Sequence, residues 1–207
     1  DVTKETMEGY LLKTKMRGPD AQQVVETEFG YLGFARLAIM GLTPDGMQPF
    51  QRDGSWVICN GEIYGFRKIK KELEERGYQF QSGSDCEVLL PLYEEYGLEM
   101  FSHLDAEYAC VLYDHKSGKL IAARDQIGIR PLFYGYSKSG KIAFASEAKN
   151  LIGWVDEVRA FPPGSYYYDG KFVKYEDIAA VHGYVHEDID VITKNIHDKL
   201  TEGVKKR

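Results

Sequence analysis

The second half of the sequence contains three successive pairs of short segments rich in β-branched and aromatic residues, each pair separated by a polar turn. The pairs are 106–114 with 119–125, 132–136 with 141–145, and 164–168 with 171–175. The turn at Asp169-Gly170 is the clearest hairpin signal, because both residue types accept the backbone angles of a tight turn. Strands joined by such turns pair antiparallel. We therefore expect a chain built mainly on antiparallel sheets.

Apolar residues at intervals of three to four predict helices in two groups and at the C-terminal end. The expected helices cover 3–15, 65–77, 86–96 and 186–207. Pro91 lies inside the third of these and predicts a kink or an early break. Additional strands are expected at 29–34, 36–39, 55–59 and, briefly, 78–81. Together with the hairpins, these elements indicate an α+β fold.

Charge and cysteine usage exclude several function classes. The chain has 26 basic and 32 acidic residues, a net charge of −6 that is scattered along the sequence. This favours neither a nucleic-acid-binding nor a membrane-binding surface. No apolar run reaches transmembrane length. The three cysteines have no close spacing and the five histidines are dispersed, so we expect free thiols, no metal site and a cytoplasmic location.

The apolar run Val57-Ile58-Cys59 leads directly into Asn60-Gly61. An Asn-Gly pair most often turns a hairpin, and this is the simplest interpretation. However, the pair also places a side-chain amide and an unobstructed glycine N–H at the end of a rigid strand. Two adjacent donors are what an oxyanion hole requires. The choice between the two interpretations depends on the other motifs in the chain.

Seven motifs occur in a fixed order along the chain. They are Arg-Gly-Pro-Asp at 17–20, Ala-Arg-Leu-Ala-Ile at 35–39, Gln-Pro at 48–49, Asn-Gly-Glu-Ile-Tyr at 60–64, Gly-Ser-Asp-Cys-Glu at 83–87, Arg-Asp at 124–125 with Gly128 and Arg-Pro-Leu at 130–132, and Ala-Ser-Glu-Ala-Lys at 145–149. From about residue 3 to 175, this series resembles the glutaminase domain of glutamine-hydrolysing asparagine synthetases, which are class II glutamine amidotransferases. Gly65 and Met16 depart from that pattern, where Asn and His are usual.

The resemblance implies an N-terminal-nucleophile hydrolase fold, a four-layer αββα sandwich with antiparallel sheets. It also implies a glutamine-binding site whose residues have distinct roles. Asn60 and Gly61 would form the oxyanion hole, Arg36 would bind the substrate α-carboxylate, and Glu62 and Asp85 would bind its α-ammonium group. The backbone of Leu37, Ala38, Ile39 and Met40 would line the same pocket, while Arg17 and Asp20 are expected to be mainly structural.

In the family that the sequence resembles, the nucleophile is an N-terminal Cys on a strand upstream of the first helix. This sequence begins at Asp1-Val2-Thr3, already at the expected helix, so that Cys is absent from it and we expect the fragment alone to be inactive. Cys86 follows Asp85 at an expected helix start, a position that can activate a thiol. Its neighbours match an ordinary motif, and Cys59 and Cys110 are expected in the core.

The resemblance further implies how the whole protein is organised. Residues 1–178 would be the glutaminase domain without its extreme N-terminus, and 179–207 a linker and the first helix of an ATP-dependent synthetase domain. That domain would use ATP and Mg²⁺ to convert aspartate to asparagine with ammonia from L-glutamine, whereas no cofactor is expected in residues 1–178. A homodimer is also expected. Two alternatives remain open: another amidotransferase or amide- or lactam-forming synthetase, and a degenerate, non-catalytic assembly domain.

Overall fold

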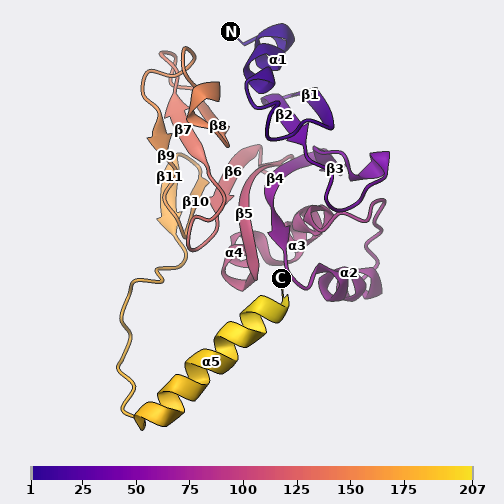
Figure 1. Cartoon of the computed structure of the whole chain (residues 1–207). Helices are drawn as coiled ribbons and strands as arrows, with labels where there is room; N and C mark the ends of the chain where they lie inside the picture. Colours follow the sequence, from indigo (N-terminus) through magenta and orange to yellow (C-terminus); the bar gives the residue numbers. More distant parts are fainter. Residues whose placement is uncertain (1, 207) are drawn as a thin grey trace. The chain divides into compact units, whose positions relative to one another are not determined.

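The computed structural model describes residues 2–206, and the chain divides into two compact units, Asp1–Glu176 and Asp177–Arg207 (Figure 1). Antiparallel sheets form the first unit. The largest has the strand order β11–β10–β6–β5–β4–β3, and β4 and β5 lie near its centre. Its strands are β3 Phe50–Arg52, β4 Ser55–Ile63, β5 Ala106–Asp114, β6 Lys119–Arg124, β10 Ser165–Tyr168 and β11 Lys171–Lys174.

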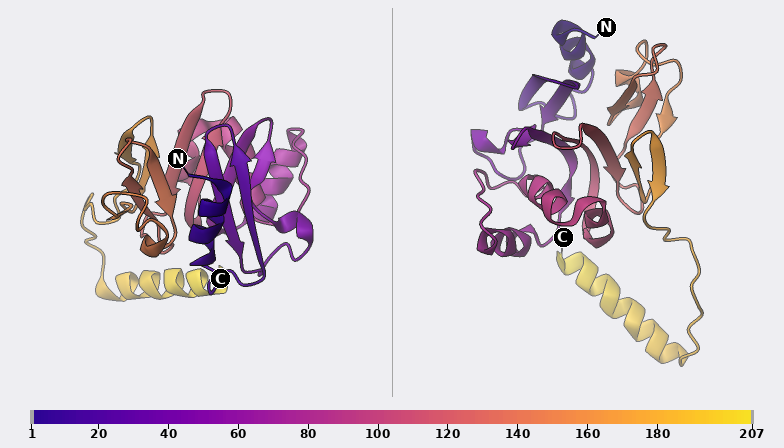
Figure 2. Two further views of the ribbon diagram at one scale, coloured as in Figure 1. Left: turned by 90° about the horizontal axis from the view of Figure 1, so that it is seen from above. Right: turned by 180° about the vertical axis from the view of Figure 1, so that it is seen from behind.

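Two smaller sheets lie over one face of the six-stranded sheet (Figure 2). One pairs β1 Ala21–Thr27 with β2 Gly30–Arg36. The other has the order β8–β7–β9, with β7 Phe133–Tyr136, β8 Ile142–Ala145 and β9 Arg159–Ala160. The α-helices of the first unit are α1 Lys4–Leu12, α2 Phe66–Glu75, α3 Leu89–Tyr96 and α4 Met100–His103. Short 3₁₀ turns are η1 Pro44–Gly46, η2 Cys86–Val88, η3 Gly97–Glu99 and η4 Ala148–Asn150.

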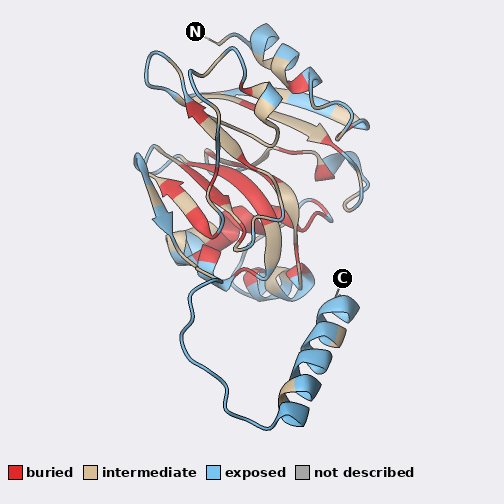
Figure 3. Cartoon of the chain, turned by 60° about the vertical axis from the view of Figure 1, so that its left-hand side comes forward, coloured by how far each residue is buried: buried red, intermediate tan, exposed pale blue. Residues whose placement is uncertain are grey.

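Two hydrophobic cores separate the layers, and strand alternation determines which side chains enter each core. Val57, Cys59 and Ile63 of β4 point into the larger core against α2, α3 and α4. Residues of the opposite face, including Val111 and Ala122, pack with Phe161 in a second core between the six-stranded sheet and β7–β8. Figure 3 shows the buried residues concentrated in the central strands. With α1 packed on β2, the layers run helix, sheet, sheet, helix, and the expected α+β fold with antiparallel sheets is confirmed.

The expectation of a turn at Asn60-Gly61 is wrong. Strand β4 continues through both residues to Ile63, in register with β5 from Trp56↔Tyr113 to Ile63↔Ala106. Gly61 allows β5 to approach β4 closely and does not form a turn. A Cβ atom there would lie 2.5 Å from the Glu107 carbonyl oxygen and 2.7 Å from the Tyr108 Cα. The Asn-Gly pattern indicated a position where glycine is required, but the requirement comes from the close approach of β5 and not from a turn.

Other expected boundaries also differ from the structure. β2 continues to Arg36, so only 37–39 of the expected strand 36–39 is a loop, and 78–81 contains no strand. Strand β1, which has polar residues at its exposed positions, was not expected at all. Pro91 falls in the first turn of α3, where backbone N–H groups have no intrahelical acceptor, so proline is accommodated without a kink. The preceding residues 86–88 form η2 instead of continuing the helix.

The second unit consists of an extended segment and helix α5 Ile189–Lys206. Within the unit, the apolar stripe of α5 is solvent-exposed, with Ile196 at 55% and Leu200 at 66% of their maximal area. Among the described residues, no helix is both long and apolar enough to cross a bilayer.

Candidate functional site

A large cleft opens on the face of the six-stranded sheet that is turned away from α2–α4. Its volume is about 1700 Å³. It is lined by consecutive residues of β2 and β8 and by residues 58–62 of β4. Helix α1 closes one end, where the Asn150 side chain donates to the Tyr10 carbonyl at 2.7 Å. Every residue expected in the glutamine site lines this cleft except Ala38.

Asn60 lies on the cleft face of β4, because alternate residues Cys59 and Ile63 enter the core on the other face. Its Nδ2 atom is buried and has no hydrogen-bond partner among the described residues. Burying an amide N–H without a hydrogen-bond acceptor costs free energy unless a ligand or a water molecule accepts its hydrogen bond. This amide is therefore a donor available to a bound group.

Gly61 provides a second donor beside it. Tyr64 donates its N–H to the carbonyl of Asp105, the residue before β5, at 2.9 Å, so in the alternating ladder of β4 and β5 the N–H groups of residues 60 and 62 also point to β5. The N–H groups of Cys59, Gly61 and Ile63 point to the other edge. Cys59 donates to Gln48 Oε1 at 2.6 Å and Ile63 to Asp85 Oδ2 at 2.7 Å. No side-chain or loop acceptor among the described residues takes the Gly61 N–H between them.

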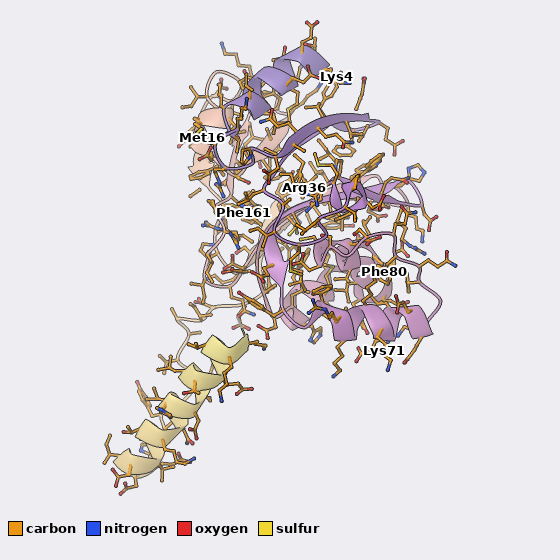
Figure 4. The ribbon with its side chains drawn as sticks, turned by 45° about the vertical axis from the view of Figure 1, so that its right-hand side comes forward. Lys4, Met16, Arg36, Lys71, Phe80 and Phe161 are labelled. Atoms are coloured by element: carbon orange, nitrogen blue, oxygen red, sulfur yellow. The ribbon has the colours of Figure 1, made fainter. Side chains whose placement is uncertain are left out.

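Arg36 is buried at the end of β2, with only 8% of its surface exposed, and Figure 4 shows it in the interior of the first unit. Its guanidinium donates to the carbonyl of Thr43 at 3.1 Å and to that of Gly41. Neither Glu62 nor Asp85 is among its partners in the described part of the chain. A planar guanidinium has five N–H donors, so donors remain for a carboxylate. Gly46 makes room, since a Cβ there would lie 2.7 Å from Arg36 NH2.

The loop after Arg36 carries the four residues expected to line the pocket through their backbone. Leu37 and Ile39 are exposed at 55% and 75%. Asp20 fixes the loop by accepting the Ala38 N–H at 2.7 Å, and its own N–H donates to the Arg36 carbonyl. This contact gives Asp20 the structural role expected of it.

Glu62 and Asp85 differ in how they are held. Asp85 is buried, and one carboxylate oxygen accepts the Ile63 N–H, which ties the 82–86 loop to the edge of β4. Glu62 is half-buried on the cleft face, and its carboxylate makes no hydrogen bond to another described residue. The site therefore contains two carboxylates near the Asn60 and Gly61 donors: that of Asp85, held by a hydrogen bond, and that of Glu62, which has none to another described residue. Together they suit a cationic group.

The three cysteines, Cys59 in β4, Cys86 in η2 and Cys110 in β5, are free thiols and all are buried. A hydrogen bond with the Cys86 thiol, together with burial, raises the pKa of Cys59. Burial raises the pKa of Cys110 to about 12. Cys86 is 2% exposed, and its Sγ lies 3.9 Å from the Gly61 carbonyl oxygen. Thiols that stay protonated are poor nucleophiles, so this environment favours a structural role.

Two residues that shape the site were noted in the sequence only as motif markers. Gln48 forms hydrogen bonds with both backbone groups of Cys59. Asp125 is 1% exposed and accepts N–H groups from Tyr108 and from residues 127–130. In the sequence, only their occurrence in the Gln-Pro and Arg-Asp motifs indicates that these two residues matter for the site. Among the described residues, no group of three His, Cys, Asp or Glu side chains is arranged to hold a metal ion.

Comparison with known proteins gives matches over most of the chain. Residues 1–169 match the family model described as a glutamine amidotransferase domain. A probable glutamine-hydrolysing asparagine synthetase from Acanthamoeba polyphaga mimivirus is 40% identical over 94% of this chain and 40% of its own length. Asparagine synthetase B from Escherichia coli K12 is 34% identical over 88% of this chain and 32% of its own length. The chain thus spans less than half the length of these relatives.

A solved structure gives the same picture of the fold. The glutamine phosphoribosylpyrophosphate amidotransferase from B. subtilis, complexed with ADP and GMP, aligns with a TM-score of 0.60 and 25% identity. The alignment covers 71% of this chain and 35% of that one.

Proposed function

Because this chain belongs to the family of glutamine amidotransferase domains, we propose that it is the glutamine-hydrolysing part of an asparagine synthetase. The relatives named glutamine-hydrolysing asparagine synthetases support this choice over other amidotransferases. The observation that carries the proposal is the unpartnered amide of Asn60 beside the edge-facing N–H of Gly61. Two preorganised donors at one point match the needs of an acyl-transfer transition state.

In the proposed mechanism, a cysteine thiolate attacks the side-chain amide carbon of glutamine. The carbonyl oxygen becomes an oxyanion and receives hydrogen bonds from Asn60 Nδ2 and the Gly61 N–H. Collapse of this intermediate breaks the C–N bond and leaves a glutamyl thioester, and ammonia departs with the proton that the general base had taken from the thiol. Water then attacks the thioester to release glutamate and regenerate the thiol.

The remaining site residues would hold the substrate at its other end. Arg36 supplies a guanidinium for the α-carboxylate, and Glu62 and Asp85 supply negative charge for the α-ammonium. The loop backbone at 37–40 would complete the pocket. Such contacts fix the amide carbon relative to the attacking thiol, which is a large part of the barrier reduction in acyl transfer.

The thiol is proposed to come from an N-terminal Cys on a segment upstream of α1, with its α-amino group as general base. The cleft of about 1700 Å³ beside Asn60 gives an extended segment room. Determining the N-terminal sequence of the intact protein tests this directly. A Cys immediately after the initiator Met supports catalysis, whereas its absence supports a non-catalytic assembly domain.

The whole protein is proposed to contain a glutaminase domain at 1–178 and a synthetase domain that begins with the linker and helix at 179–207. The synthetase domain would use ATP and Mg²⁺ to activate aspartate, and ammonia from this site would form the amide. We further propose a cytoplasmic homodimer, supported by the three unpaired buried thiols and the exposed stripe of α5. Light scattering that shows a monomeric full-length protein would contradict the dimer.

The test of the function is steady-state kinetics of the full-length protein with Asn60→Ala. Loss of one oxyanion donor should lower glutamine hydrolysis by roughly 10²–10³-fold. Synthesis with added ammonium salt should persist, because it does not use this site. Unchanged glutamine hydrolysis in the variant would refute the site assignment.

A further inference from the structure

Two glutamates face each other on the cleft side of the central strands. Glu62 of β4 and Glu107 of β5 are direct partners in the antiparallel register. Side chains at such positions have Cβ atoms roughly 5 Å apart, and like charges there are destabilising. The Glu107 side chain is only 14% exposed, so water screens the repulsion weakly. An arrangement of this kind requires a compensating cation.

Arg130 is that cation. Its NH2 group lies 3.0 Å from Glu107 Oε1. The loop that carries it is firmly held, because Asp125 accepts the Arg130 N–H at 3.0 Å and Arg124 Nε donates to the Arg130 carbonyl at 2.8 Å. Arg130 also lines the cleft, and its buried Nε has no partner among the described residues.

We propose that Glu107 and Arg130 are positioning residues that leave the Glu62 carboxylate free to bind a substrate ammonium group. Arg130 neutralises Glu107, so Glu62 has no uncompensated negative neighbour across the strand. The Glu62 carboxylate makes no hydrogen bond to another described residue, which leaves both of its oxygens for a ligand. This inference rests on the proposed glutaminase function, because it assigns the recognition of one substrate group within that site.

Without the Arg130 charge, Glu107 and Glu62 would repel each other. Repulsion between carboxylates favours protonation of one of them, which raises its pKa. A protonated Glu62 binds an ammonium group weakly, so the substrate affinity should fall and should fall further as the pH decreases. The chemical step, which occurs at Asn60 and Gly61, should be little changed.

The experiment measures glutamate release from glutamine by the full-length protein at pH 6 and pH 8. Arg130→Gln should raise KM roughly 10-fold, within the range of coupling between charges in contact, with kcat changed less than about twofold. The increase in KM should be larger at pH 6 than at pH 8. Arg130→Lys, which keeps the charge, should recover most of the affinity.

The double variant Glu107→Gln/Arg130→Gln tests whether the change in KM comes from repulsion between Glu107 and Glu62. Removing both charges removes the repulsion, so its KM should return to within roughly threefold of the unaltered protein. Arg159→Gln disrupts an exposed ion pair with Glu157 and serves as the matched control, with no expected change in KM. If Arg130→Gln does not fold, the double variant and Arg130→Lys still decide the question.

An unchanged KM in Arg130→Gln, or a loss of kcat at constant KM, overturns the positioning role. So does a double variant whose KM is at least as high as that of Arg130→Gln. These results leave the proposed function intact as long as the unaltered protein hydrolyses glutamine. Failure of the unaltered full-length protein to do so overturns the proposed function together with this inference.

Discussion

The side chain of Gln48 pairs with the main chain of Cys59 as a neighbouring strand would. Gln48 Oε1 accepts the Cys59 N–H at 2.6 Å, and Gln48 Nε2 donates to the Cys59 carbonyl at 3.1 Å. Strand β3 pairs with β4 only up to Val57, so this side chain continues the pairing for the residue before Asn60. This buried side-chain amide therefore holds the edge of β4 directly before the proposed oxyanion donors.

Replacing Gln48 with Ala should destabilise the protein and weaken the site together. Both backbone groups of Cys59 would lose their partners, which costs about 2–4 kcal/mol of unfolding free energy when two buried groups are affected. Glutamine hydrolysis should fall because the neighbouring Asn60 loses its support. Gln51→Ala, at an exposed position of β3, is the control and should change neither property. Urea unfolding and glutaminase kinetics provide the measurements.

Gly61→Ala should be poorly tolerated because the new methyl group would overlap the backbone of β5. Overpacking of this kind typically costs about 1–3 kcal/mol, and widening the β4–β5 contact should also displace the Gly61 N–H. Gly9→Ala in α1 meets no atom within 4 Å and should stabilise the helix by about 0.5–1 kcal/mol. Thermal unfolding of both variants tests the contrast, and an equal effect of the two would contradict it.

Asp125→Ala should be among the most destabilising substitutions in the chain. Its two carboxylate oxygens accept five backbone N–H groups, and of these only the Gly128 N–H has a second acceptor among the described residues, the Asp125 carbonyl, that the substitution keeps. We expect a loss of at least about 3 kcal/mol in unfolding free energy. Asp156→Ala, at an exposed position, is the control. Similar midpoints of chemical denaturation for the two variants would argue against this role of Asp125.

The buried thiols should make stability fall at alkaline pH. The folded state holds the pKa of Cys110 at about 12, above its usual value, so the unfolded chain loses this proton first as the pH rises. The stabilisation is present below the ordinary thiol pKa and is lost progressively from about pH 9 towards pH 12. Cys59 contributes with the same sign, because its pKa is also raised.

This can be measured by denaturant unfolding between pH 7 and pH 11, with Cys110→Ala reducing the slope above pH 9. At neutral pH, native Cys59 and Cys110 should react with iodoacetamide far more slowly than they do in urea. Rapid labelling of the native protein at both positions would show that the thiols are less protected than the structure indicates.

Local patterns were sufficient for much of the fold. The helices α1, α2 and α5 follow from apolar spacing, and the three C-terminal hairpins follow from turn residues between apolar runs. Strand β1 was missed because three of its seven residues are exposed and polar, so its pairing with β2 supplies the stability that its own composition does not. Propensity is a weak signal when pairing decides the outcome.

For the candidate site, the order of motifs along the chain indicated which residues belong together. It did not show how they are held. The contacts of Gln48 with Cys59, Asp20 with Ala38 and Asp125 with Tyr108 each join residues that are more than ten positions apart, so the sequence alone does not show that they are close in space. Similarly, Arg36 donates to loop carbonyls rather than to an acidic partner, which only the folded chain could show.

From the sequence alone, the order of the motifs along the chain, and not the Asn-Gly pair by itself, indicated that Asn60 and Gly61 belong to the candidate site. The tertiary structure shows how these two residues can act as hydrogen-bond donors. β4 runs straight through them, the glycine is required by the approach of β5, and alternation of the ladder turns its N–H to the open edge. Sequence patterns reflect local backbone preferences, whereas the direction of an N–H and the absence of a partner for an amide are set by strand pairing and packing.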